Sequence, residues 1–436
     1  MNKFVKVLSA TGMAAILAAC SSSTSAPAAP AEEGSSKVTG TYVANIAAED
    51  YGCGVDKMVV TLDNPIDAIK AEDLKVTEVK EGFDWAAEGG PTHVMDLTTE
   101  RKVLDAKVDG TELTIDLAID PDNGSPIWWS LETQFNSWSD PYTLNVELAE
   151  GAKITSGGTE VTELSIDPTP AKMVSPADDW TQTKMSAGGI DYNVAEYKVD
   201  GSDKLFVWLH GMGEGGSGVE GLKTDAAVTI LANKVTALAG EDFQTTLGGC
   251  NVIAPQSPTM WMQGEDEKDI AGPRHSFYEQ SLIELIDNYV AENNIKTVFI
   301  GGCSNGGYMT MNLAMECGDK YQGYVPICEA MLDEYITDED IATLAKTNLY
   351  FIWAKNDDTV DPTKYEIPTT ERLEKAGAKF SVFNPDDVHD TTGKYNDEDG
   401  KPHQYSGHWS WCYFDNDETA DQNGVSAFDW LASLLK

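Results

Sequence analysis

Positive charge is scarce in this sequence. Its 436 residues include 30 Lys and Arg against 72 Asp and Glu, which gives a formal net charge of −42. A chain this acidic repels the phosphate backbone of nucleic acids and the headgroups of anionic lipids. The imbalance therefore argues against nucleic acid as a partner and indicates a heavily solvated surface, but it does not indicate a fold.

The apolar stretch near the N-terminus is too short to cross a membrane. Lys3 and Lys6 precede the stretch Val7–Ala19, whereas a spanning helix needs about 20 apolar residues. Positive charge followed by a short apolar run is typical of a secretory signal peptide, which we predict over residues 1–19.

The stretch ends in Leu17-Ala18-Ala19-Cys20, which resembles a bacterial lipoprotein signal. The resemblance implies that cleavage precedes Cys20 and that its sulfur carries a diacylglyceryl group. Two acyl chains suffice for stable anchoring, so we expect an exported protein held on the outer face of the cytoplasmic membrane, at the cell surface. The alternative is that Cys20 is only a small residue near an ordinary cleavage site. Residues 20–37 are rich in Ser, Ala and Pro and predict a flexible tether.

Paired C-x-x-C spacing is also missing, so we predict no structural zinc site. Export permits disulfides, but the sequence does not choose among the pairings that six cysteines allow. The acidic run Asn396–Gly400 lacks the full spaced ligands of a calcium loop, so we interpret it as a solvated turn. The six cysteines other than Cys20 are Cys53, Cys250, Cys303, Cys317, Cys328 and Cys412.

Two patterns divide the rest of the chain, and no internal repeat is visible. Between residues 38 and 166, short runs of alternating apolar and polar residues are separated by turns, which is typical of a β-sandwich. Examples are Met58–Leu62, Leu113–Leu117 and Tyr142–Leu148. The segment Asp167–Pro170 ends this pattern, so we predict a β domain over residues 38–170.

From residue 175 to residue 436, buried strands alternate with helical stretches. This alternation predicts an α/β domain whose mostly parallel sheet is covered by helices on both faces. Helices are predicted at Ser276–Asn293 and Val425–Leu435. The predicted strands are Lys204–Leu209, Asn251–Ala254, Thr297–Ile300, Gly323–Ile327, Leu349–Trp353 and Phe380–Phe383.

A G-x-S-x-G motif lies in the second domain, at Gly302-Cys303-Ser304-Asn305-Gly306. It falls between a predicted buried strand and a predicted helix at Tyr308–Glu316, which is the setting that a nucleophile elbow requires. The turn is so tight that bulky side chains two residues before or after the serine would clash. We therefore predict Ser304 as a nucleophile, with the Cys303 side chain pointing into the fold.

The acid and the base of a catalytic triad are expected later in the chain, in the order Ser, Asp, His. Asp357 follows the strand Leu349–Trp353 and is the predicted acid, with Asp358 one register step away. His408 precedes the last helix and is the predicted base, with His389 as the alternative. His403 is a more distant third candidate for the base.

The glycine-rich segment Leu209–Gly215 follows a buried strand and predicts an oxyanion loop. The backbone N–H groups of Met212 and of Asn305 would stabilise the negative charge that develops during acyl transfer. His210 is expected to brace this loop.

Taken together, the segments LHGMGEGG, VIAPQSP, GGCSNGGY and GHWSW resemble bacterial carboxylesterases in which an immunoglobulin-like domain precedes an α/β-hydrolase domain. This group is related to the phospholipase/carboxylesterases and to the prolyl oligopeptidases. The resemblance implies a serine esterase that forms an acyl-enzyme on Ser304 and needs no cofactor or metal. It also implies a pocket for an ester substrate, for which Trp261, Trp409 and Trp411 are candidate lining residues.

Two other functions compete with the esterase. A serine peptidase of the prolyl-oligopeptidase type would use the same triad, but the blade repeats of its usual propeller domain are missing. A surface lipoprotein that only binds a ligand would have no need of a nucleophile, acid, base and oxyanion loop in this order.

Overall fold

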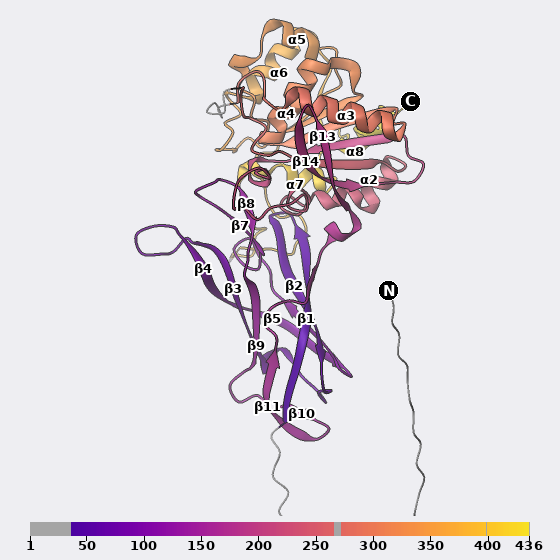
Figure 1. Cartoon of the computed structure of the whole chain (residues 1–436). Coiled ribbons are helices and arrows are strands. Elements are labelled where there is room, and N and C mark those ends of the chain that lie inside the picture. The colour runs from indigo at the N-terminus through magenta and orange to yellow at the C-terminus, as the bar shows by residue number, and fades with distance from the viewer. Residues whose placement is uncertain (1–35, 266–271, 398, 436) are drawn as a thin grey trace, which may run out of the picture.

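The computed structural model describes residues 36–265, 272–397 and 399–435 of the chain. The predicted signal peptide at residues 1–19, Cys20 and most of the predicted tether lie outside the described residues. Figure 1 shows two regions, an elongated front β region (residues 36–174) and a region of sheet and helices (residues 175–435). The second is named the catalytic region because the sequence predicts the triad residues there. In the described part of the chain, no helix combines the length and the apolar character that crossing a membrane requires.

The front β region is built mainly from two sheets. A seven-stranded sheet has the order β10-β11-β1-β2-β6-β5, with β12 paired to β1, and a three-stranded sheet has the order β4-β3-β9. A short hairpin, β7–β8, completes the region. The strands are β1 (Ser36–Glu49), β2 (Gly52–Leu62), β3 (Leu74–Asp84), β4 (Thr92–Arg101), β5 (Val103–Asp109), β6 (Glu112–Leu117), β7 (Ile127–Trp129), β8 (Asn136–Trp138), β9 (Tyr142–Leu148), β10 (Thr155–Ser156), β11 (Thr159–Ile166) and β12 (Lys172–Val174).

Alternation of apolar and polar residues explains why these segments form sheets with one buried face. In β9, Tyr142, Leu144 and Val146 are buried, whereas the residues between them are not. Successive side chains of a strand point to opposite faces, so this pattern turns one face to the interior. β9 begins and ends where the sequence predicts, and β2 extends the predicted run Met58–Leu62 back to Gly52.

The catalytic region contains one eight-stranded sheet with the order β13-β14-β16-β15-β17-β18-β19-β20. The strands from β16 to β20 run parallel, and the hairpin β13–β14 adds two antiparallel strands at one edge. This hairpin is not predicted from the sequence pattern, because its first strand is largely exposed. The strands are β13 (Thr181–Ala187), β14 (Ile190–Tyr197), β15 (Lys204–Leu209), β16 (Asn251–Gln256), β17 (Thr297–Cys303), β18 (Gly323–Ile327), β19 (Tyr350–Ile352) and β20 (Ser381–Phe383).

Helices cover both faces of this sheet, as predicted (Figure 1). Leu205, Val207 and Leu209 of β15 pack into a cluster with α3 and α4, whereas the intervening Phe206 and Trp208 pack into a second cluster with α2, α7 and α8. A strand buried on both faces needs this nearly continuous apolar sequence. The helices are α1 (Val228–Leu231), α2 (Glu241–Thr246), α3 (Glu279–Asn293), α4 (Asn305–Cys317), α5 (Asp338–Leu344), α6 (Glu366–Lys375), α7 (Trp411–Asp415) and α8 (Ala427–Ser433).

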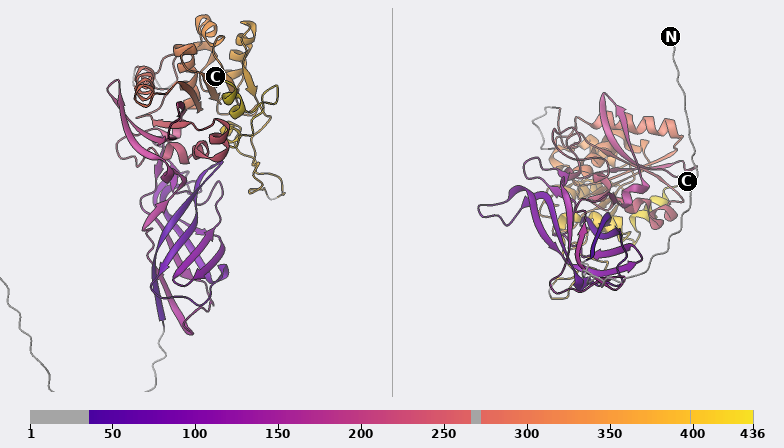
Figure 2. Two further views of the ribbon diagram at one scale, coloured as in Figure 1. Left: turned by 90° about the vertical axis from the view of Figure 1, so that its right-hand side faces the viewer. Right: turned by 60° about the horizontal axis from the view of Figure 1, so that its bottom comes forward.

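The turn between β1 and β2 reaches into the catalytic region (Figures 1 and 2). The buried Asp50 carboxylate accepts a hydrogen bond from Lys234 Nζ at 2.8 Å and from the Asn416 amide at 3.1 Å. Glu49 forms an ion pair with Lys394 at 2.8 Å. One hydrophobic cluster runs from the front β region into the helices α7 and α8. The two regions are therefore joined by a shared core as well as by polar contacts.

Candidate active site

Ser304 occupies the sharp turn between β17 and α4, with φ 55° and ψ −114°. A positive φ is strained for a residue with a Cβ atom and marks positions that the surrounding structure holds in place. A Cβ atom on Gly302 would lie 2.3 Å from the Leu209 carbonyl oxygen, and one on Gly306 would lie 1.8 Å from it. The two glycines of the motif are therefore required because β15 passes directly against the turn.

His408 and Asp357 form a buried pair. Asp357 Oδ2 lies 2.8 Å from His408 Nδ1, and its Oδ1 accepts the backbone N–H groups of Thr359 and Val360, each at 2.9 Å. A carboxylate can only accept a hydrogen bond, so Nδ1 carries the proton and Nε2 is free to accept one. Ser304 and His408 line the same cavity, so a hydroxyl and an imidazole acceptor face one space.

The alternative residues for the acid and the base lie elsewhere. Asp358 is exposed. The ring of His389 is bonded to Asp387 at 2.8 Å and that of His403 to Asp397 at 2.7 Å, and neither histidine lines the cavity. The structure therefore brings together Ser304, Asp357 and His408.

His210 is fully buried beside the predicted oxyanion loop. Its Nδ1 donates to the Gly211 carbonyl at 2.5 Å, and its Nε2 accepts the Ser257 N–H at 3.0 Å. Burial lowers the pKa of His210 to about 4, so the ring is neutral and both nitrogens are occupied. His210 is thus a brace for the loop and has no free nitrogen to act as a base.

The two predicted oxyanion donors lie at the starts of helices. Met212 begins a single turn of 3-10 helix, Met212–Glu214, and Asn305 is the first residue of α4. The first N–H groups of a helix have no partner within it, which leaves them available to an anion. The Asn305 side chain accepts the Trp261 backbone N–H at 2.6 Å, and this bond fixes the start of α4.

The cavity at Ser304 has a volume of about 570 Å³, and both regions of the molecule line it. Trp409 and Trp411 belong to its wall, as the sequence analysis suggested. Trp261 does not line the cavity, because its ring is fully buried against His210, Tyr192 and Tyr278. The front β region contributes Tyr51, Gly52, Cys53, Asp120, Pro121, Ser125, Ile127, Trp129 and Asn136.

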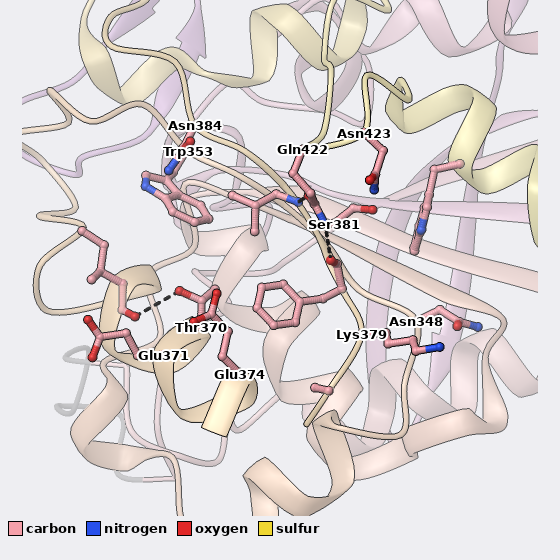
Figure 3. Close-up of a pocket in the computed structure, with 15 residues that line it drawn as sticks. Asn348, Trp353, Thr370, Glu371, Glu374, Lys379, Ser381, Asn384, Gln422 and Asn423 are labelled. Atoms are coloured by element: carbon pink, nitrogen blue, oxygen red, sulfur yellow. Dashed lines mark hydrogen bonds between the residues drawn. The ribbon is translucent and has the colours of Figure 1, made fainter. Parts of the chain in front are cut away.

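A second cavity, of about 820 Å³, follows the edge strand β20 and is shown in Figure 3. The side chain of Gln422 closes part of this edge, since its amide accepts the Val382 N–H and donates to the Phe380 carbonyl. None of the three triad candidates lines this cavity. It is larger than the cavity at Ser304 but holds none of the chemistry described above.

The six cysteines of the described residues are all free thiols. Burial raises the pKa of Cys303 well above its usual value, and its side chain is fully buried. A thiol that stays protonated is a poor nucleophile. Cys303 lines the cavity but is therefore a poor candidate for the nucleophile.

One cluster with metal-binding side chains was not anticipated from the sequence. His275, Glu279 and Glu316 place possible ligand atoms within 4.8 Å of one another. The guanidinium of Arg274 lies 3.9 Å from Glu279 and already supplies positive charge there. We assign no metal to this cluster, which is formed by α3, α4 and the segment before α3 and shares no residue with the cavity at Ser304.

A buried acid in the cavity wall was also missed. Glu214 belongs to the oxyanion loop, is 5% exposed, and accepts hydrogen bonds from Asn136 and Asn233. Its only signal in the sequence is an acidic residue inside a glycine-rich segment that follows a buried strand.

Comparison with solved structures places this site in a known fold. A thermostable esterase is similar over 87% of this chain and 96% of its own, with 17% identity and a TM-score of 0.64. A ferulic acid esterase (10% identity, 59% of this chain, 98% of that chain, TM-score 0.40) and a fluorophosphonate-binding serine hydrolase of Staphylococcus aureus (15% identity, 48% of this chain, 92% of that chain, TM-score 0.33) were also matched. No protein-family model and no curated protein sequence matches the chain. The chain thus has the α/β-hydrolase fold.

Proposed function

We propose that this protein is a serine esterase that hydrolyses carboxylic esters through an acyl-enzyme on Ser304. The observation that carries the proposal is that a strained serine elbow and a buried His408–Asp357 pair open onto one cavity. A purely structural role does not require that a serine at positive φ and a histidine whose Nε2 can accept a proton line the same cavity.

The reaction follows from the placement of these groups. Ser304 Oγ attacks the ester carbonyl carbon while His408 Nε2 takes the hydroxyl proton. The N–H groups of Met212 and Asn305 stabilise the oxyanion of the tetrahedral intermediate. His408 then gives its proton to the departing alkoxide, which leaves as an alcohol. Water, deprotonated by His408, then attacks the acyl-enzyme, the bond between the acyl carbon and Ser304 Oγ breaks, and His408 returns the proton to Oγ as the acid leaves. The hydrogen bond from His408 Nδ1 to Asp357 holds the imidazole in place through both steps.

The residues that line the cavity favour esters with apolar groups of modest size as substrates. Trp409, Trp411 and, from the front β region, Tyr51 and Trp129 supply aromatic surface around Ser304. Aromatic and apolar walls with a few polar groups are typical of sites for small organic ligands. We further propose that the front β region is an immunoglobulin-like domain that forms part of this substrate pocket.

The location of the protein is a separate proposal. The sequence Leu17-Ala18-Ala19-Cys20 supports lipidation of Cys20 and anchoring at the cell surface. Radiolabelled palmitate should enter the wild-type protein in bacterial cells and should not enter Cys20→Ala. Equal labelling of the two proteins would contradict this proposal.

The proposed activity is tested with p-nitrophenyl esters of two to sixteen carbons and a matched panel of peptides, with the chain from Ser21 onward. We expect turnover of short esters, and loss of it in Ser304→Ala. Cleavage of peptides without esters would instead support a peptidase. A protein that cleaves neither and still binds a ligand would support the surface-binding alternative.

A further inference from the structure

Glu214 is a buried acid that the proposed reaction does not use. It lies in the oxyanion loop two residues after Met212 and lines the cavity at Ser304. Among the residues that the structure describes, no Lys, Arg or His lies within ion-pair distance of it. A buried carboxylate without a cation must be satisfied by hydrogen bonds, because removing its charge from water is costly.

Two side-chain amides from different parts of the chain donate to this carboxylate. Oε1 accepts from the Asn136 side chain in β8 of the front β region at 3.0 Å, and Oε2 accepts from the Asn233 side chain at 3.2 Å. The carboxylate also packs directly against the backbone of Gly211. The carboxylate therefore closes the oxyanion loop on itself and ties it to the front β region.

The glycines of the loop show how closely these groups pack. A Cβ atom on Gly211 would lie 2.9 Å from Glu214 Oε2, and one on Gly213 would lie 2.8 Å from Asn136 Nδ2. On the other side, Gln256 donates to the Glu214 carbonyl at 2.9 Å. The segment that carries the Met212 N–H is held between the central sheet and the β7–β8 hairpin.

We propose that Glu214 is a positioning residue that couples the front β region, through Asn136, to the oxyanion loop. Asn136 donates to Glu214, Glu214 fixes the backbone at Gly211, and this sets the direction of the Met212 N–H. The inference rests on the proposed function, in which Met212 is an oxyanion donor. Burial raises the pKa of Glu214 to about 7, and the hydrogen bonds from Asn233 and Asn136 oppose this rise because they stabilise the charged form.

The test compares Asn136→Ala with Ser137→Ala in the same strand. Ser137 also bonds across to the catalytic region, at the Lys223 backbone, but has no bond to Glu214. Oxyanion stabilisation acts in the transition state only, so a displaced donor lowers kcat and leaves KM nearly unchanged. We expect kcat of Asn136→Ala to fall about 10- to 100-fold, and that of Ser137→Ala to stay within about twofold of the wild type.

Three further measurements separate positioning from a general loss of structure. The affinity for a trifluoromethyl ketone, which forms the same oxyanion, should fall in parallel with kcat/KM in Asn136→Ala. Asn136→Asp keeps the volume of the side chain but removes the donor, so it should also lower kcat if Asn136→Ala fails to fold. The double variant Asn136→Ala/Glu214→Gln should be little worse than either single one, because the residues act as one unit.

The outcomes are distinct from a failure of the proposed function. An inactive wild type would remove the esterase proposal itself. An active wild type with unchanged kcat in folded Asn136→Ala and Asn136→Asp would overturn the coupling alone. A loss expressed only in KM would overturn it as well, because it would place Asn136 in substrate binding.

Discussion

The front β region and the catalytic region differ in where they place polar groups. In the front β region, the buried Arg101 bonds to Glu78 and to two backbone carbonyls. In the catalytic region, His210, Glu214, Asp357 and His408 are buried near the carboxyl ends of parallel strands. Ligands of open α/β sheets bind at this end. The buried polar groups thus differ in role: Arg101 and Glu78 stabilise the front β region, whereas those of the catalytic region form the proposed active site and its supports.

The largest expected effect is that of removing the proposed nucleophile, Ser304, from the catalytic region. Ser304→Ala should lower kcat for esters by about 10⁶-fold, as loss of a triad serine does. Steady-state kinetics with p-nitrophenyl acetate measures it. Cys303→Ser is the matched control, because the thiol of Cys303 is next to Ser304 but is buried and protonated. A comparable loss of kcat in Cys303→Ser would undermine the distinction between the two residues.

The next effect separates the two histidines. Asp357→Asn should lower kcat about 10⁴-fold, because His408 would lose the partner that fixes its tautomer. Measured under the same conditions, His389→Ala should leave kcat almost unchanged, since its ring contacts Asp387 on the surface. Equal losses in the two variants would show that the base has been assigned to the wrong histidine.

In the front β region, breaking the buried pair of Arg101 and Glu78 should lower stability and leave the catalytic activity intact. The side chains of Arg101 and Glu78 are each 1% exposed. Arg101→Met leaves Glu78 with Lys80, at 3.2 Å, as its charged partner and removes the hydrogen bonds to two backbone carbonyls, which should lower the free energy of unfolding by about 3 kcal/mol. Urea unfolding measures this loss, and kcat of the folded protein should change little. Arg101→Met/Glu78→Leu should recover much of the stability, and failure to do so would argue against the pair as the cause.

The smallest effect is expected at the exposed ion pair between Glu49 and Lys394, one of the polar contacts between the regions. Lys394 is 57% exposed where it meets Glu49. An ion pair this open to water contributes about 1 kcal/mol or less, so Lys394→Ala should barely shift the urea midpoint. A shift as large as that of Arg101→Met would mean that the surface contact, and not the shared core, joins the two regions.

The sequence predicts the regular parts of the fold well because their signals are local. β15 and β18 begin and end where continuous apolar runs do, and the elbow at Ser304 is marked by its two glycines. The α3 helix begins at Glu279 instead of Ser276, because a turn precedes it. The hairpin β13–β14 was missed because its outer strand is mostly polar and exposed.

The site is less predictable because its partners are distant in the chain. The choice of His408 over His389 depends on a contact with Asp357 across 51 positions. The bond from Asn136 to Glu214 spans 78 positions and leaves no pattern in the sequence. Both the choice of base and the Asn136–Glu214 bond depend on proximity in three dimensions, which a local sequence pattern does not encode.

The most direct test of the account is covalent labelling of the chain from Ser21 onward with a fluorophosphonate, followed by peptide mass spectrometry. The account predicts one adduct, on Ser304, that forms slowly in Asp357→Asn and is missing in Ser304→Ala. An adduct on Cys303 or another residue, or no adduct in a protein that still hydrolyses esters, would contradict Ser304 as the nucleophile.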